Sequence, residues 1–306
     1  MVVKKKRLDK KLLFYIGLLA LPLLQFCIFY IYVNFKFILY AFQDTTNLSG
    51  NYNFCGFANF EKVFEEVLVN AKMAFTIRFK NSLFNYLMTL VIGMVGAIFF
   101  SYYIYKKQFL SGTFKIVLFL PHIIPTVALM SMFRYFIDAG GVTLVNKVFG
   151  LDPPIASLLN NDKYNYPIIL GFSLFIGFGT QVLMYLGAMN KINPSITEAA
   201  ELDGITFFRE LWYITLPNIF SSISTFLVLG LTTFFKGDMG VFTLKANNAG
   251  NHIQTLGYYL MREINVNKTN EARWGYLSAF GLCCTLIVAP LSYVLRQFLD
   301  KVDPMA

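Results

Sequence analysis

Charged residues, histidine and cysteine are all scarce in this sequence of 306 residues. Only 14% of the residues are charged and 56% are hydrophobic, which is too much apolar surface for the core of one soluble domain. The two histidines, His122 and His252, have no Cys or carboxylate at ligand spacing, so we expect no metal site. The four cysteines are scattered and provide no disulfide framework.

The sequence also lacks a phosphate-binding loop, because no Gly-rich segment ends in Gly-Lys-Ser or Gly-Lys-Thr. No Ser/His/Asp or Cys/His arrangement suggests a catalytic site, so we predict a non-catalytic chain. The net charge of +9 is compatible with nucleic-acid binding, but the basic residues lie at the ends of apolar runs. Membrane topology explains this placement better, and we expect no nucleic-acid partner.

Long hydrophobic runs are the dominant feature of the chain. Crossing a bilayer core of about 30 Å takes roughly 20 apolar residues in a helix, because no backbone polar group is left unpaired in lipid. The runs that meet this requirement are residues 12–35, 83–105, 116–137, 168–189, 217–235 and 276–295. We therefore predict an all-α integral membrane protein with about six transmembrane helices.

The first run is about twice as long as the apolar core of a signal peptide, and we interpret it as a retained helix. The prolines inside the runs are predicted to kink helices rather than end them. They are Pro22, Pro121, Pro125 and Pro290.

The distribution of basic residues predicts the orientation. Half of the 26 Lys and Arg residues lie in the short segments 1–11, 106–115, 190–215 and 296–306. The other half is spread over stretches about twice as long in total, so the positive-inside rule makes the first group cytoplasmic. We expect a multi-pass membrane protein with both termini in the cytoplasm.

Two external loops show helical spacing of apolar residues. The first covers residues 59–68, with Asn59 as the expected N-cap of an interfacial helix. The second follows a polar stretch and uses Leu256, Tyr259 and Leu260. We expect a short helix in each loop.

The segment 192–217 is the most informative part of the sequence. Asn193 is suited to cap a helix whose first residue is Pro194, and Gly204 can adopt the left-handed conformation that ends it. Thr206 is suited to cap a second helix. The pattern predicts a helix–turn–helix, which is either an ordinary amphipathic connector or a surface for a partner.

The same segment resembles the EAA loop of binding-protein-dependent ABC importer permeases. The residues that carry the resemblance are Glu198-Ala199-Ala200, Asp203-Gly204, Ile214, Leu216 and Pro217. In that family the loop is a coupling helix that docks in a groove of a cytoplasmic ATPase, and the resemblance implies this role here. Ile205 stands where the family usually has Ala.

The resemblance extends over about residues 56–299 and implies a type I ABC importer permease fold in a bacterial cytoplasmic membrane. Segments 56–60, 120–125 and 133–136 resemble carbohydrate-type permeases, and 236–242 looks closest to permeases for oligosaccharides or polysaccharide fragments. The common Gly-Gly-Pro after the fifth span is absent. We divide the chain into an N-terminal part, 1–76, with the tail, first span and interfacial helix, and a permease core, 77–306, that contains the coupling loop at 190–217.

The family resemblance also implies partners. They are a cytoplasmic ABC ATPase dimer that binds ATP and Mg²⁺, a second permease subunit that is similar but non-identical, and an extracytoplasmic solute-binding protein. No cofactor is expected in this chain itself. The alternatives are an ABC permease for amino acids, phosphate or phosphorylated glycerol, and a secondary transporter, which the scarcity of mid-span ionisable residues disfavours.

Polar groups inside apolar spans are the candidates for the solute pathway, because an unpaired amide in lipid is costly and tends to face a cavity or another helix. Gln181 is the clearest of them, and Tyr185 follows one turn later. Thr232 is a further candidate, although Ser and Thr hydroxyls often bond to their own helix.

Overall fold

The computed structural model describes residues 10–46, 52–150, 154 and 156–304, and most of these residues are helical. Within them the sheet structure consists of two short antiparallel strands, β1 (Gln43–Asp44) and β2 (Asn53–Phe54). The basic cluster at residues 4–7, which contributes to the predicted orientation, lies outside the described residues.

Six helical segments within the described residues are long and apolar enough to cross a membrane. They are Phe14–Ala41, Lys72–Tyr105, Thr126–Phe149, Asn165–Met189, Phe207–Lys245 and Glu271–Val302. The prediction of an all-α membrane protein with about six spans is confirmed.

The chain forms two compact units. Unit 1 consists of Met1–Glu66 and Asn267–Cys283, and unit 2 consists of Val67–Val266 and Cys284–Ala306. The last helix, α15 (Trp274–Val302), contributes its first part to unit 1 and the rest to unit 2.

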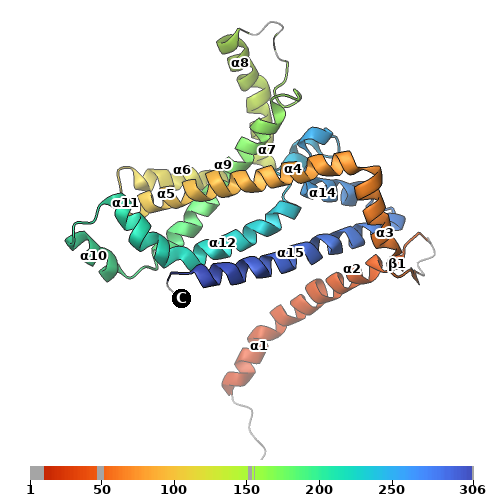
Figure 1. The fold of residues 1–306 in the computed structure, drawn as a ribbon, viewed down its shortest axis with the longest axis horizontal. Helices are drawn as coiled ribbons and strands as arrows, with labels where there is room; N and C mark the ends of the chain where they lie inside the picture. The colour runs from red at the N-terminus through yellow and green to blue at the C-terminus, as the bar shows by residue number, and fades with distance from the viewer. Residues whose placement is uncertain (1–9, 47–51, 151–153, 155, 305–306) are drawn as a thin grey trace, which may run out of the picture. The chain divides into compact units, whose positions relative to one another are not determined.

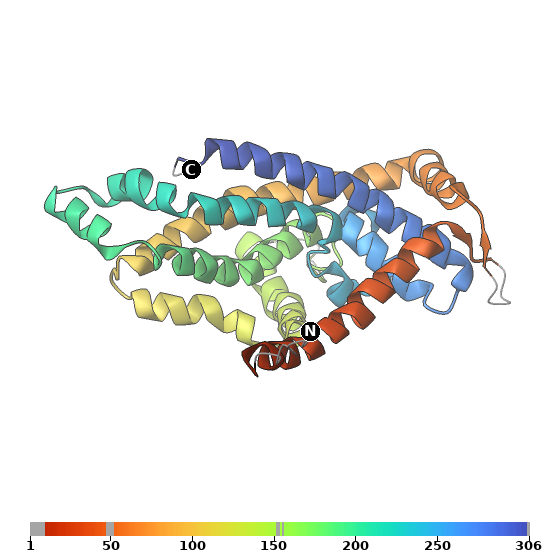
Figure 2. The same cartoon turned by 90° about the horizontal axis from the view of Figure 1, so that it is seen from below.

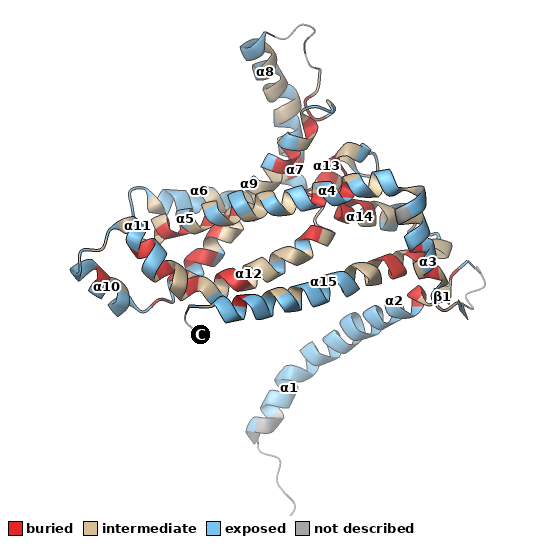
Figure 3. Ribbon diagram, viewed as in Figure 1, coloured by how far each residue is buried: buried red, intermediate tan, exposed pale blue. Residues whose placement is uncertain are grey.

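Unit 1 begins with one long helical run, α1 (Lys10–Gln25), a π-helical segment (Phe26–Tyr32) and α2 (Val33–Ala41). Pro22 lies inside α1, as expected of a kink. The side chains from Phe14 to Leu39 are exposed, and Figure 3 draws this part of the run in pale blue. Apolar side chains exposed over such a length are what a lipid-facing span presents.

The helix predicted over residues 59–68 is α3 (Ala58–Phe64), followed by π-helical residues Glu65–Asn70. Its predicted N-cap is wrong: Phe57 occupies the N-cap position, and Asn59 lies inside the helix. The buried Asn59 amide instead donates to the backbone oxygens of Ala41 and Gln43, at 3.1 and 2.8 Å. The side chain therefore bonds to one carbonyl at the end of α2 and one in β1, and it does not cap the start of its own helix.

Unit 2 contains the remaining helices (Figure 1). They are α4 (Lys72–Met88), α5 (Val95–Tyr105), α6 (Ser111–Ile123), α7 (Thr126–Tyr135), α8 (Val142–Phe149), α9 (Asn165–Met189), α10 (Pro194–Leu202), α11 (Phe207–Glu210), α12 (Leu216–Lys236), α13 (Val241–Lys245) and α14 (Leu256–Val266). π-Helical segments connect α4 to α5 (Thr89–Met94), α7 to α8 (Phe136–Gly141) and α11 to α12 (Leu211–Thr215). Helix α14 confirms the short helix predicted in the last external loop.

The third predicted span, 116–137, is wrong as a single helix. Helix α6 ends at Ile123, Ile124 is extended with ψ 132°, and α7 begins after Pro125. The ring of a proline disfavours helical backbone in the residue before it, so Pro125 separates two helices instead of kinking one. Pro121 and Pro290 do lie inside helices, α6 and α15.

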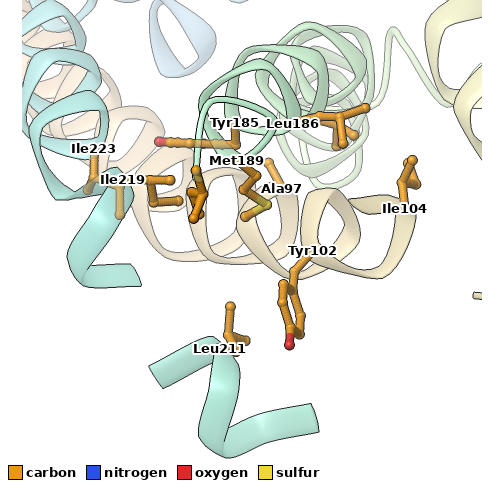
Figure 4. Packing of buried hydrophobic residues seen from close by; sticks show 11 residues of the cluster. Ala97, Tyr102, Ile104, Tyr185, Leu186, Met189, Leu211, Ile219 and Ile223 are labelled. Carbon is orange, nitrogen blue, oxygen red and sulfur yellow. The ribbon is translucent and has the colours of Figure 1, made fainter. Parts of the chain in front are cut away.

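Helices α5, α9 and α12 enclose the main core of unit 2, and Figure 4 shows this packing. Its fully buried side chains include Ala97 and Tyr102 from α5, Val182 and Met189 from α9, and Ile219 from α12. Leu211, from the segment before α12, lies in the same cluster. The core therefore reaches the loop between α9 and α12.

Candidate functional site

The loop 190–217 begins with α10, and its start has the local chemistry that the sequence predicts. The side-chain oxygen of Asn193 accepts a hydrogen bond from the backbone N–H of Ser195 at 3.1 Å. Pro194 is the first helical residue, where its missing N–H costs nothing. The predicted cap of this helix is confirmed.

The end of α10 is a tight glycine turn. Gly204 has a φ of +70°, in the left-handed region. The N–H of Gly204 donates to the oxygen of Glu201, and the N–H of Ile205 donates to the oxygen of Ala200, at 3.1 and 3.2 Å. This is the Schellman pattern, in which the residue with positive φ lets the N–H groups at the helix end bond to the last free carbonyls of the helix. The predicted left-handed conformation of Gly204 at the end of the helix is confirmed.

The second half of the loop is helical from Phe207 onward and leads directly into the fifth span. Helix α11 continues through the π-helical segment into α12, with Pro217 in the first turn of α12. Ile214 and Leu216 are half-buried, and Leu216 packs against the main core. Thr206 occupies the predicted cap position, although its side chain makes no capping hydrogen bond.

Helix α10 presents most of its surface to the outside. Ala200 is buried and faces the unit. Glu198, Ala199 and Asp203 are exposed, and Leu202 is 90% exposed. A leucine so fully exposed on a helix with carboxylates beside it is a surface on which a partner can dock.

A lysine outside the loop joins its two helices. Lys106, in the turn between α5 and α6, places its Nζ 2.6 Å from a carboxylate oxygen of Glu201 on α10 and 3.0 Å from one of Glu210 on α11. Burial disfavours the charge of Lys106, but the hydrogen bonds that Lys106 donates to the two carboxylates outweigh this effect and raise its pKa. The same lysine lowers the pKa of Glu201. In the sequence, Lys106 is recognisable only as one of the basic residues that indicate topology, because no local pattern links residues about 100 positions apart.

Helix α11 has a second contact with α5. The hydroxyl of Tyr102 donates to the backbone oxygen of Phe207 at 3.0 Å, and the two rings lie 4.6 Å apart between centroids. Tyr102 is fully buried. Both views place α10 at the same end of unit 2 as the α5–α6 turn (Figures 1 and 2).

The three candidates for the solute pathway have different surroundings. The amide oxygen of Gln181 is buried and has no hydrogen-bond partner, and a Cβ added at Gly93 would lie 3.2 Å from it. Tyr185 is 2% exposed and packs its ring against Phe226. The hydroxyl of Thr232 donates to the oxygen of Leu229 in its own helix, at 2.7 Å. Gln181 is thus the candidate whose side-chain oxygen is free to accept a hydrogen bond.

In the part of the chain that the structure describes, six apolar helices and an exposed helix–turn–helix between the fourth and fifth of them define a multi-pass membrane protein. The chain belongs to the family of binding-protein-dependent transport system inner membrane components, whose family model matches residues 90–305. It is therefore a membrane transport subunit.

Similar proteins of known annotation include three bacterial permeases. The chain is 23% identical over 283 residues to the multiple sugar-binding transport system permease protein MsmF of Streptococcus mutans, covering 92% of this chain and 93% of that protein. It is 27% identical over 234 residues to the polygalacturonan/rhamnogalacturonan transport system permease protein YteP of Bacillus subtilis, covering 74% and 70%. It is 25% identical over 308 residues to the diacetylchitobiose uptake system permease protein NgcF of Streptomyces coelicolor, covering 96% and 85%.

Two solved structures have the same fold. One is a chain of a bacterial ABC transporter involved in the import of the acidic polysaccharide alginate, with a TM-score of 0.71, 17% identity and 96% coverage of both chains. The other is from a bacterial alginate ABC transporter in complex with an alginate pentasaccharide-bound periplasmic protein, with a TM-score of 0.71, 19% identity and 98% coverage of both chains. The predicted ABC importer permease fold is confirmed.

Proposed function

We propose that this chain forms part of the membrane pathway of an ATP-driven importer of sugars or oligosaccharides and couples to a separate ATPase through the loop 190–217. One observation carries the proposal. The residues that match the EAA loop fold into an exposed, capped helix, α10, which is joined by a glycine turn to the start of a membrane span. A rigid helix in this position can transmit a partner's movement to the spans.

The ATPase is proposed to be a dimer of separate chains. This sequence has no phosphate-binding loop of its own, so ATP and Mg²⁺ bind to those partners. Glu198 on α10 and Asp203 at its C-cap are exposed and supply negative charge for a basic groove, and Leu202 supplies an apolar contact. The docking face thus combines a central apolar group with surrounding charges.

A second permease subunit, similar to this chain but not identical, is proposed to complete the pathway. Six spans of this size rarely enclose a sugar-sized path alone, and exposed apolar side chains on unit 2 include Val91, Val95 and Phe175. Such surfaces are satisfied by lipid or by neighbouring helices in a bilayer. The remaining proposed partner is an extracytoplasmic solute-binding protein, which is supported by the family's description as binding-protein-dependent transport systems.

The solute class is proposed from the relatives. Those reported above are named for sugars, for polygalacturonan and rhamnogalacturonan, and for diacetylchitobiose. The proposed orientation has both termini in the cytoplasm of a bacterial cell, which follows from the density of basic residues. The C-terminal end of α15 lies toward the end of unit 2 that carries α10 (Figure 1), in keeping with this orientation.

The proposal is tested by purifying the chain from its native membrane with its companions and reconstituting the complex in proteoliposomes. Binding-protein-stimulated ATP hydrolysis and saccharide uptake are measured for the wild type, Glu198→Lys and Asp300→Lys. We expect Glu198→Lys to assemble but to lower both activities by about tenfold or more, because it places like charge against a basic groove. Asp300→Lys reverses an exposed carboxylate elsewhere and should retain them.

The same experiment separates the alternatives. Uptake without any bound ATPase would identify a secondary transporter. Uptake of an amino acid, phosphate or phosphorylated glycerol, with no saccharide bound by the solute-binding protein, would preserve the ABC assignment and refute the solute class. Full activity of Glu198→Lys would make α10 a plain connector.

A further inference from the structure

The loop 190–217 is held to the membrane helices by a cation. Lys106 Nζ lies 2.6 Å from Glu201, on α10, and 3.0 Å from Glu210, on α11. These two carboxylates are on opposite sides of the Gly204 turn. A single side chain from the α5–α6 turn therefore contacts both helices of the loop and fixes the angle between them.

The two ion pairs differ in exposure. The side chain of Glu210 is 3% exposed and that of Lys106 is 15% exposed, whereas that of Glu201 is 62% exposed. A buried carboxylate requires its cation, because an unpaired charge away from water is costly. An exposed pair contributes much less and is easily released. The Glu210 pair is therefore the stronger anchor of Lys106, and the Glu201 pair is the weaker of the two.

The turn that carries Lys106 is unusual in its backbone. Lys107 and Leu110 both have positive φ, 50° and 58°, although neither is glycine. Left-handed backbone at such residues is unfavourable and persists only where the surroundings determine it. Tyr102, one turn before Lys106, is fully buried and bonds to Phe207. The end of α5 and the turn after it are therefore fixed in conformation, and they contact the loop through Tyr102 and through Lys106.

We infer that Lys106 is a positioning residue that holds α10 in line for the ATPase, with the Lys106–Glu201 pair acting as an ionic latch between α10 and the end of α5. This inference rests on the proposed function of α10. With the latch closed, a push on α10 moves α5 and α12 together. With the latch open, α10 can pivot about Gly204, and part of the movement is lost before it reaches the spans.

The test compares Lys106→Gln, Lys106→Arg and Glu201→Gln with a matched control, Lys107→Gln. Lys107 is the adjacent lysine in the same turn, and its side chain is exposed. The first readout is hydrogen–deuterium exchange of the α10 amides in the purified chain. The second is the ratio of saccharide taken up to ATP hydrolysed by the reconstituted complex.

We expect α10 exchange to rise about tenfold in Lys106→Gln, which removes the cation of both pairs. In Glu201→Gln, which breaks only the exposed pair, we expect a rise of about two- to fivefold. The uptake-to-hydrolysis ratio should fall in both variants. Lys106→Arg should keep both the exchange rate and the uptake-to-hydrolysis ratio near their wild-type values, because a guanidinium can bond to two carboxylates at once. Lys107→Gln should match the wild type.

The outcomes remain distinguishable when a variant misfolds or when the proposed function is wrong. If Lys106→Gln fails to assemble, Glu201→Gln decides, because it leaves the buried Lys106–Glu210 pair intact. Unchanged α10 exchange in Glu201→Gln would overturn the latch, whatever the transport activity. If exchange rises but the wild-type complex hydrolyses no ATP, the latch stands as a structural contact and the proposed function fails. An unchanged uptake-to-hydrolysis ratio with raised exchange would overturn the role in coupling.

Discussion

At the scale of single residues, glycine decides how closely two helices approach. A Cβ added at Gly179, in α9, would lie 1.9 Å from the backbone oxygen of Leu118, in α6. Backbone cannot move aside as a flexible side chain can. Small residues at such crossings are the usual means of close packing in membranes, where burial from water contributes little between helices.

We therefore predict that Gly179→Ala destabilises the protein by about 1 to 3 kcal/mol or more, the usual range for an overpacked core. Gly177→Ala, in the same helix, is the matched control, because a Cβ at Gly177 meets nothing within 4 Å. Alanine there should be neutral or stabilising, since glycine is the weaker helix former. Thermal unfolding of both variants in detergent measures the difference. Equal midpoints would contradict the close approach.

The side chain of Gln181 has a buried amide oxygen without a hydrogen-bond partner. An unsatisfied buried polar atom costs about 1 to 3 kcal/mol, and its replacement by an apolar group can stabilise a protein. We predict that Gln181→Leu is as stable as the wild type or more so, yet raises the apparent KM of solute uptake. Met184→Leu, also in α9, is the control.

Kinetics of uptake in proteoliposomes, together with thermal unfolding, check this prediction. A stabilised Gln181→Leu variant with unchanged KM would remove Gln181 from the solute pathway. Tyr185 and Thr232 stay weaker candidates, because Tyr185 packs in the core and the Thr232 hydroxyl bonds to its own helix. Their predicted contact with solute is not tested by the present structure.

At the scale of elements, local signals predicted the loop 190–217 well. Asn193, Pro194 and Gly204 act through their own backbone neighbours, so their sequence order was enough to place the cap and the turn. Asn59 shows the limit of such reasoning. As an N-cap, its side-chain oxygen would accept from a backbone N–H in the next turn. In the structure its amide N–H instead donates to carbonyls 16 and 18 positions earlier, a tertiary contact that no local pattern reveals.

The third span shows a second limit. The apolar run extends without a break through residues 116–137. The backbone restriction on the residue before Pro125 nevertheless divides this run between two helices, α6 and α7. Pro121 and Pro290 stay inside helices, so the identity of the residue does not decide between a kink and an end. The contact between Lys106 and the loop had no sequence signal at all, since it is created by tertiary packing.

We predict that Gly204→Val disconnects solute uptake from ATP hydrolysis while Gly204→Asn largely preserves it. No atom lies within 4 Å of the position a Cβ would take, so the effect is one of backbone strain and not of collision. A β-branched residue at a φ of +70° costs about 1 to 3 kcal/mol, whereas asparagine tolerates this region.

Binding-protein-stimulated ATPase activity and saccharide uptake in the reconstituted complex provide the measurement. The Val variant should assemble normally and lose uptake more than hydrolysis. Equal behaviour of the Val and Asn variants would mean that α10 can reorient without consequence.

At the scale of the whole molecule, charge placement predicts which loops face the cytoplasm. The loop 190–217 and the C-terminal segment are on the basic side, whereas the last external loop, which contains Lys268, is on the other. The rule is statistical, because basic residues are held back from crossing during insertion. A direct measurement of sidedness therefore tests the architecture independently of transport.

We predict that an impermeant thiol reagent added outside intact cells labels Lys268→Cys but not Ser195→Cys, and that Ser195→Cys is labelled only after the membrane is opened. Both positions are exposed, so access to the reagent is matched. The background for both variants replaces Cys27, Cys55, Cys283 and Cys284 by alanine, which removes the four native thiols. External labelling of Ser195→Cys would place α10 away from any cytoplasmic ATPase, and the proposed coupling through this loop would be excluded.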